Sequence, residues 1–305
     1  MKNSTIDLAN AGQYKVQLVG DRDAIRLTNI PNDPTFDSAW FSLFDNTGAE
    51  MHSQRATRYK GELGYTLQYV TPGNYKLQVL QPTSAGSNLY TIYLRNIPVT
   101  IENNRMVYFE YAPVYEHNVK VHNQLKKDIT TLENYKKLPS DCNADIIKKS
   151  FEITKWCFND YSKTLAVHDW IASNIYYDMD SFLKHSIDYS KLGKATPAFS
   201  NKLAVCSGYS ALAVAMLRSL GLPAFSQSCY ALGLSTTGKW TSNNIHQNAN
   251  HSITMVYLQK RWLIMDITWD SNNKYQNGTF QQNGQISHRY FDPTLQFISG
   301  THKLC

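Results

Sequence analysis

The stretch Val205–Ala224, VCSGYSALAVAMLRSLGLPA, joins a cysteine to a strongly helical run. Apolar residues recur every four positions from Leu212 to Leu220, and the alanines between them favour helix. Gly221 and Pro223 then supply a stop signal. The segment therefore predicts a helix that begins at the cysteine, and the remaining sequence is best interpreted around it.

Cys206 lies at the expected N-terminus of this helix. Unpaired backbone N–H groups and the helix dipole favour negative charge there, and the thiolate is the nucleophilic form of cysteine. The alternative is a buried cysteine that acts only as a small apolar residue, as most free cysteines do. The choice depends on whether the chain supplies a base and a group that orients it.

The composition excludes several classes of protein. The chain has 305 residues, enough for two domains, and a formal net charge of +6 without a dense run of Lys and Arg, so we expect no nucleic-acid partner. No stretch reaches about 18 apolar residues, so we expect no membrane insertion. The first 30 residues lack the apolar core of a signal peptide, which fits a cytoplasmic protein or one whose signal has been removed.

The sequence predicts no cofactor and no metal. The five cysteines are irregularly spaced and indicate neither a disulfide framework nor a zinc site. Among the nine histidines there is no H-x-x-x-H pair on a predicted helix, which argues against a metal hydrolase.

The N-terminal part, residues 1–115, predicts an all-β sandwich that acts as an accessory domain. Short alternating segments are separated by turn residues such as Asn46-Thr47-Gly48 and Pro72-Gly73-Asn74. The expected strands are YKVQLVG, AIRLTNI, AWFSLFD, YTLQYV, NYKLQVLQ, LYTIYLRNI and MVYFEYAPVY. The pattern resembles immunoglobulin-like modules, and a protein or cell-surface ligand of this domain is one expectation.

Residues 116–140 are polar and lysine-rich and predict a connector. From residue 141 to 305 the pattern changes to α+β. One helix is expected to begin after Asp141 or Asn143 and another to cover 162–178, with His168 and Asp169 supporting the core or, alternatively, acting in catalysis. Residues 178–203 and 233–250 predict loops, and residues 251–270 predict two strands around a turn at Gln259-Lys260.

That turn sets a register that can be tested. With Leu258 opposite Arg261, Ile253 faces Asp266, and His251 becomes a diagonal neighbour of Asp266 on the same face. A carboxylate that holds an imidazole in one tautomer prepares it as a general base. A turn shifted by one residue would place the two side chains on opposite faces.

Three segments carry a family resemblance: KTLAVHDWIASNIYYD, AVCSGYSALAVAMLRSLGLPA and HSITMVYLQKRWLIMDITWD. Together with RYFDPTLQFISGTHK they resemble the transglutaminase-like core of the papain-like cysteine enzyme superfamily, in which helices pack on an antiparallel sheet. The resemblance implies Cys206 as nucleophile, His251 as base and Asp266 as orienting residue. The family often has H-A-W after the histidine, whereas this chain has Ser252-Ile253, and no side chain matches an oxyanion-hole donor.

The resemblance implies acyl transfer from a peptide or protein amide through a thioester at Cys206. We expect hydrolysis, because sparse acidic clusters do not suggest the calcium sites of large cross-linking enzymes. The alternatives are a protein-glutamine transglutaminase with an amine acceptor and a non-catalytic scaffold that uses the β-sandwich. Because bacterial relatives often carry extracellular accessory domains, the resemblance favours a secreted or cell-surface location.

Overall fold

The computed structural model describes residues 2–11, 14–233, 239–282, 284 and 286–305. The chain divides into two compact units. Unit 1 comprises Met1–Glu116, Leu232–Thr241 and Thr294–His302, and unit 2 comprises His117–Ala231, Ser242–Pro293 and Lys303–Cys305. Within the described ranges, no helix is long and apolar enough to cross a membrane. The domain boundaries drawn from the sequence stay predictions.

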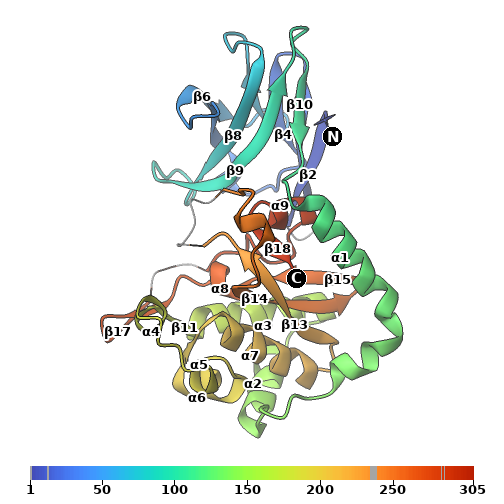
Figure 1. Ribbon diagram of the computed structural model, residues 1–305, viewed down its shortest axis with the longest axis vertical. Helices are drawn as coiled ribbons and strands as arrows, with labels where there is room; N and C mark the ends of the chain where they lie inside the picture. Colours follow the sequence, from blue (N-terminus) through green and yellow to red (C-terminus); the bar gives the residue numbers. More distant parts are fainter. Residues whose placement is uncertain (1, 12–13, 234–238, 283, 285) are drawn as a thin grey trace. The chain divides into compact units, whose positions relative to one another are not determined.

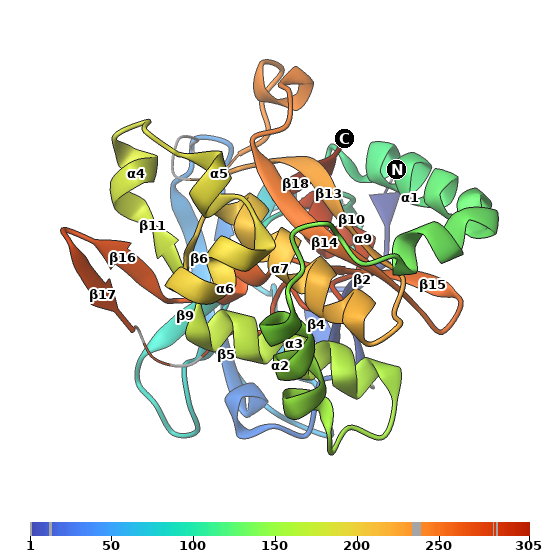
Figure 2. The same cartoon turned by 90° about the horizontal axis from the view of Figure 1, so that it is seen from below.

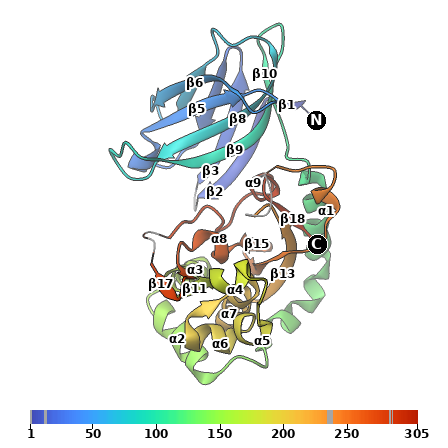
Figure 3. The same ribbon diagram turned by 60° about the vertical axis from the view of Figure 1, so that its left-hand side comes forward.

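Unit 1 contains two antiparallel sheets, and the strands of the larger one are drawn side by side in Figure 3. The larger sheet has the order β1 (Lys2–Asn3), β10 (Val107–Glu110), β9 (Tyr90–Ile101), β8 (Gly73–Pro82), β5 (Ser38–Phe44) and β6 (Glu50–Thr57). The smaller one has the order β2 (Thr5–Ala11), β3 (Tyr14–Asp21), β4 (Ala24–Thr28) and β7 (Leu63–Thr66).

Both sheets of unit 1 contribute to one apolar core. Leu18 and Ile25 from the smaller sheet belong to the same buried cluster as Phe41, Leu77 and Phe109 from the larger one. The alternating pattern predicted most of these strands, because inward and outward residues alternate along each strand. It missed β1, β2 and β6, and the strand expected at YTLQYV ends at Thr66. The immunoglobulin-like assignment stays a prediction.

The four-stranded sheet of unit 2 has the order β15 (Arg261–Met265), β14 (His251–Leu258), β13 (Ala224–Ala231) and β18 (His302–Leu304), and Lys303 and Leu304 are the residues of β18 that belong to this unit. Leu258 pairs with Arg261 and Thr254 with Met265, so the predicted register is confirmed. Gln259 and Lys260 both have positive φ, at 51° and 63°. Such values match the twist of a two-residue hairpin turn.

Helix α7 (Cys206–Ser219) is the central element of unit 2, and its predicted start at Cys206 is confirmed. It packs against β13 and β14, and also against α2 (Ala144–Thr154), α3 (Asp160–Asn174) and α6 (Ala195–Asn201), as Figure 2 shows. Residues from Gly208 to Leu217 are buried almost without interruption. A helix that is apolar all round belongs in a core.

Glycines fix both ends of α7. At the C-terminal end Gly221 has φ +77°, and Leu222 N donates to Leu217 O, which closes a Schellman motif. Near the N-terminal end, a Cβ on Gly208 would lie 2.2 Å from the carbonyl oxygen of Leu192. Only glycine therefore allows the first turn of α7 to lie against the backbone of α5 (Tyr189–Leu192).

One segment of unit 2 is more ordered than the sequence predicted. The expected loop 178–203 is wrong: it holds β11 (Tyr176–Asp178), α4 (Met179–Leu183), α5, α6 and β12 (Leu203–Ala204). Asp178 and Asp188 cap α4 and α5 through Ser181 N and Ser190 N, so these polar residues start helices instead of filling a loop. Strand β11 pairs in parallel with β12 and with β16 (Lys274–Gln276), which in turn pairs with β17 (Thr279–Gln281).

The connector contains α1 (Tyr115–Lys127) and the 3₁₀ segment η2 (Asp128–Lys136), both drawn in green in Figure 1. His122 Nε2 lies 3.1 Å from Trp262 O, and Trp262 Nε1 donates to Leu125 O at 3.0 Å. These bonds hold α1 against β15 within unit 2. Of the loop expected at 233–250, residues 234–238 lie outside the described ranges, and η3 (Asn244–His246) forms one turn in the remainder.

Candidate active site

Cys206 occupies the first position of α7, and Val205 is the N-cap residue. The side chain of Val205 supplies no capping hydrogen bond to the first turn. The thiol is partly exposed. The backbone N–H groups at this terminus therefore lie beside the sulfur, in the position where a thiolate gains from the helix dipole.

His251 begins β14 in the same sheet that packs on α7. It is paired with Cys229 on β13, and its side chain is 8% exposed. His251 Nε2 donates to Asp266 Oδ2 at 2.7 Å, so the structure brings together the base and the orienting residue predicted from the hairpin register. The Cys206 side chain lies near enough to this imidazole to influence its pKa. With Nε2 engaged by Asp266, Nδ1 is the nitrogen left for the thiol.

Asp266 is completely buried, and it lies at the N-cap of a helix rather than within the expected strand. The predicted second strand stops at Met265, and residues Ile267–Asp270 form the one-turn helix α8 with Asp266 as its N-cap. Asp266 Oδ1 accepts from Trp269 N at 3.2 Å. The D-x-T-W-D segment turns into a helix because an N-cap aspartate satisfies an otherwise unpaired N–H group.

The electrostatics of this pair favour a charged imidazole. Burial by itself would lower the pKa of His251, but the Asp266 charge, the hydrogen bond to Asp266 and the nearby Cys206 side chain outweigh it and raise that pKa to about 10. A protonated His251 can stabilise a neighbouring thiolate and can later donate its proton. A cysteine, a histidine and an aspartate in this order can carry nucleophilic acyl transfer.

An aromatic side chain lies beside His251, although the H-A-W pattern is absent after it. The ring of Trp269 lies 5.9 Å from the His251 ring, and Tyr290 packs edge-on against Trp269 at 5.2 Å. Tyr290 O also accepts from Asp266 N at 3.0 Å. Sequence reasoning missed this arrangement because Trp269 reaches His251 from the next helix rather than from its own strand.

A second polar network lies in unit 2 around the fully buried His168 of α3. His168 Nε2 contacts Asp270 Oδ2 at 3.1 Å, and His168 Nδ1 contacts Asp169 Oδ1 at 2.8 Å. His288 Nε2 reaches the same oxygen of Asp169 at 2.7 Å. Asp270 is also buried and accepts from Tyr290 N. Only His168 and Asp169 were considered from the sequence, because nothing in the spacing links them to residues about a hundred positions away.

The charges in this network are coupled. Burial raises the pKa of Asp270. Burial would lower the pKa of His168, but the two neighbouring carboxylates raise it. Burial by itself would raise the pKa of Asp169, but the hydrogen bonds that Asp169 accepts from His168 and His288 lower that pKa to about 2. Asp169 is therefore an ionised acceptor for both imidazoles.

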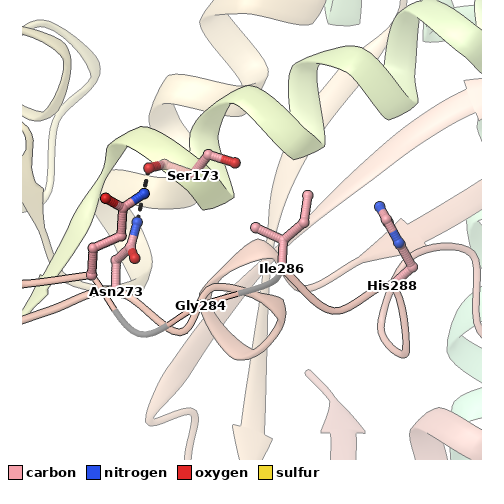
Figure 4. A pocket seen from close by; sticks show the side chains of 6 residues that line it. Ser173, Asn273, Gly284, Ile286 and His288 are labelled. Carbon is pink, nitrogen blue, oxygen red and sulfur yellow. Dashed lines mark hydrogen bonds between the residues drawn. The ribbon is translucent and has the colours of Figure 1, made fainter. Parts of the chain in front are cut away.

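A pocket opens beside this network and is seen from close by in Figure 4. Its lining includes Ser173, Asn273, Ile286 and His288. Asn273 Nδ2 donates to Ser173 O at 2.9 Å, which fixes one wall. The His288 side chain extends from the segment that follows Ile286, so the pocket gives solvent access to one member of the network.

Comparisons with known proteins agree with the unit 2 geometry. Residues 147–267 match the model of the Transglutaminase-like superfamily. Kyphoscoliosis peptidase of Mus musculus is 24% identical over 152 residues, which cover 48% of this chain and 22% of that protein. The chain thus spans about a fifth of the length of this curated relative.

Two solved structures share low similarity with the chain. A candidate cysteine protease from Cytophaga hutchinsonii has a TM-score of 0.35 at 18% identity, covering 80% of this chain and 71% of that one. A structure described as a TGase has a TM-score of 0.33 at 19% identity, covering 64% of this chain and 48% of that one. Scores this low add no argument about activity. The family match rests on residues 147–267, and this part of the chain is similar to a transglutaminase-like core.

Proposed function

We propose that the protein hydrolyses peptide or protein amides through a thioester at Cys206. The observation that carries the proposal is the 2.7 Å contact between His251 Nε2 and Asp266 Oδ2, with the Cys206 side chain near the same imidazole. A scaffold has no chemical need for a buried carboxylate that orients a histidine toward a thiol. The three side chains therefore support an enzyme over a non-catalytic binding protein.

In the first half-reaction, the Cys206 thiolate attacks the amide carbonyl carbon and forms a tetrahedral intermediate. The backbone N–H of Cys206 at the start of α7 is placed to donate to the oxyanion. The His251 imidazolium then gives its proton to the amide nitrogen, the C–N bond breaks and the amine leaves. An acyl-thioester on Cys206 and a neutral His251 remain, with Asp266 holding the ring.

In the second half-reaction, neutral His251 takes a proton from water, and the resulting hydroxide attacks the thioester carbonyl. Collapse of the intermediate breaks the C–S bond, releases the carboxylic acid and restores the thiolate–imidazolium pair. A lysine amine in place of water gives an isopeptide bond, which is the protein-glutamine transglutaminase alternative. Hydrolysis is preferred because the curated relative is described as a peptidase.

The test is to incubate the protein with a set of glutamine-containing peptides, with and without a labelled primary amine, and to measure product masses. Cleavage adds one water across a backbone amide, deamidation exchanges a side-chain NH₂ for OH, and transfer adds the label. We expect cleavage or deamidation without label in the wild type and no product with Cys206→Ala.

Cys305→Ala is the matched control, because Cys305 is an exposed free thiol outside the proposed site. This variant should retain full activity. Label incorporation that depends on Cys206 would replace hydrolysis by transglutamination. If no product depends on Cys206, the enzyme proposal is wrong and the non-catalytic scaffold remains as the alternative.

A further inference from the structure

We propose that His168, Asp169 and His288 form a binding site for one divalent transition-metal ion, with Zn²⁺ as the best chemical match. The three side chains offer His168 Nδ1, Asp169 Oδ1 and His288 Nε2, and these atoms all lie within 4.8 Å of one another. The proposal concerns a second site in unit 2 and does not depend on the function proposed for Cys206.

Both imidazoles point at the same carboxylate oxygen. His168 Nδ1 and His288 Nε2 lie 2.8 Å and 2.7 Å from Asp169 Oδ1, so the three ligand atoms already converge. Ligand atoms bound to one Zn²⁺ at about 2.0–2.2 Å must lie close together in this way. Two imidazole nitrogens and one carboxylate oxygen are ligands that Zn²⁺ accepts.

The far side of His168 has the support that a metal-bound histidine requires. Its Nε2 lies 3.1 Å from Asp270 Oδ2, and both side chains are fully buried. A carboxylate that accepts from the second ring nitrogen fixes the tautomer and orients the ring toward the metal. His168 would then carry its proton on Nε2, which leaves the Nδ1 lone pair for the ion. Tyr290 N donates to Asp270 at 3.1 Å and holds this carboxylate in turn.

The site is accessible from one side. The side chains of Asp169 and His288 are 36% and 49% exposed, and His288 also lines the pocket in Figure 4. An ion can therefore enter from solvent, and water can occupy a fourth position of the tetrahedral shell. Because His168 and Asp169 lie on α3 and His288 lies in the segment after β17, the ion would join two segments of unit 2 that are far apart in sequence.

The experiment measures Zn²⁺ binding by calorimetry and Co²⁺ binding by visible absorption, starting from the Cys206→Ala protein. That background is needed because Cys206 and His251 together can also bind these metals. We expect one bound ion, a Co²⁺ spectrum typical of imidazole ligation and a Zn²⁺-dependent rise in melting temperature. His288→Ala should weaken binding at least about tenfold and remove the thermal shift, whereas Asp270→Asn should weaken it about 10–100-fold.

His185→Asn is the matched control, because His185 is an exposed histidine in unit 2 and asparagine tolerates its φ of 52°. This variant should bind Zn²⁺ like the Cys206→Ala background. His288 is half exposed, so its loss leaves the core intact and a folded His288→Ala protein is expected. The proposal is overturned if the background protein binds no stoichiometric ion, or if His288→Ala binds it with unchanged affinity.

Discussion

Asp266 is the N-cap of the one-turn helix α8 and Asp270 is its last residue, and each accepts a hydrogen bond from a different histidine. Asp266 pairs with His251 at 2.7 Å, and Asp270 pairs with His168 at 3.1 Å. Both carboxylates are fully buried. One short segment therefore supports the proposed catalytic base at one end and the proposed metal ligand at the other, which makes the two roles separable by mutation.

Replacing Asp266 by Asn should lower kcat/KM by about 10²–10⁴-fold, because the neutral amide neither fixes the tautomer nor stabilises the imidazolium. With the pKa of His251 at about 10, the wild-type imidazole is charged below that pH, and activity should fall as pH rises through it. In Asp266→Asn, burial is no longer opposed by the carboxylate, so the alkaline limb should move to lower pH. A kcat/KM profile against pH measures both effects, and an unmoved limb would contradict the assigned pairing.

Replacing Asp270 by Asn should change stability far more than catalysis. The amide can still accept from His168 but carries no charge, and we expect a loss of about 1–3 kcal/mol in the free energy of unfolding. Because Asp266 and His251 keep their contact, kcat/KM should change by no more than a few-fold. Urea denaturation and steady-state kinetics on the same preparation separate the two. A catalytic loss as large as that of Asp266→Asn would show that α8 acts as one unit.

Adding a methyl group at Gly208 should destabilise unit 2 strongly. A Cβ there would lie 2.2 Å from Leu192 O and 2.8 Å from the Ala204 Cβ, so the backbone itself must move. We expect Gly208→Ala to lower the free energy of unfolding by about 3 kcal/mol or more. Gly64→Ala is the control, since nothing lies within 4 Å of its added Cβ. Equal unfolding midpoints for the two variants would refute the close approach.

The Arg261–Asp292 pair should contribute far more than an exposed ion pair. Asp292 is 2% exposed and accepts two 2.6 Å bonds from the Arg261 guanidinium. Arg261→Met leaves a buried carboxylate without its cation and should lower the free energy of unfolding by about 2–4 kcal/mol. This loss is somewhat smaller than that expected for breaking a wholly buried ion pair, because Arg261 is partly exposed. Arg26→Met removes the exposed pair with Asp21 and should cost less than about 1 kcal/mol. Thermal denaturation compares them, and similar losses would argue against this ranking.

The local sequence determined the elements that hold the proposed catalytic residues. Periodicity from Leu212 to Leu220 predicted α7 and placed Cys206 at its start, because an amphipathic repeat and a glycine stop are local signals. The turn at Gln259-Lys260 predicted the hairpin register and hence the approach of His251 to Asp266. Because local geometry fixes the strand pairing across a two-residue turn, the contact between His251 and Asp266 could be predicted from the sequence.

Tertiary structure decided what the local signals left open. Asp266 caps a helix rather than extending a strand, and the stretch 178–203 forms short capped helices. A polar side chain can lie in a loop, in a strand or at a helix cap, and the backbone N–H groups near it in the folded structure determine which of these forms. The network of His168, Asp169, Asp270 and His288 joins segments about a hundred residues apart, and only their packing in unit 2 brings these side chains together. The spacing of these residues along the chain does not predict such contacts, because the contacts form only where separate elements pack together.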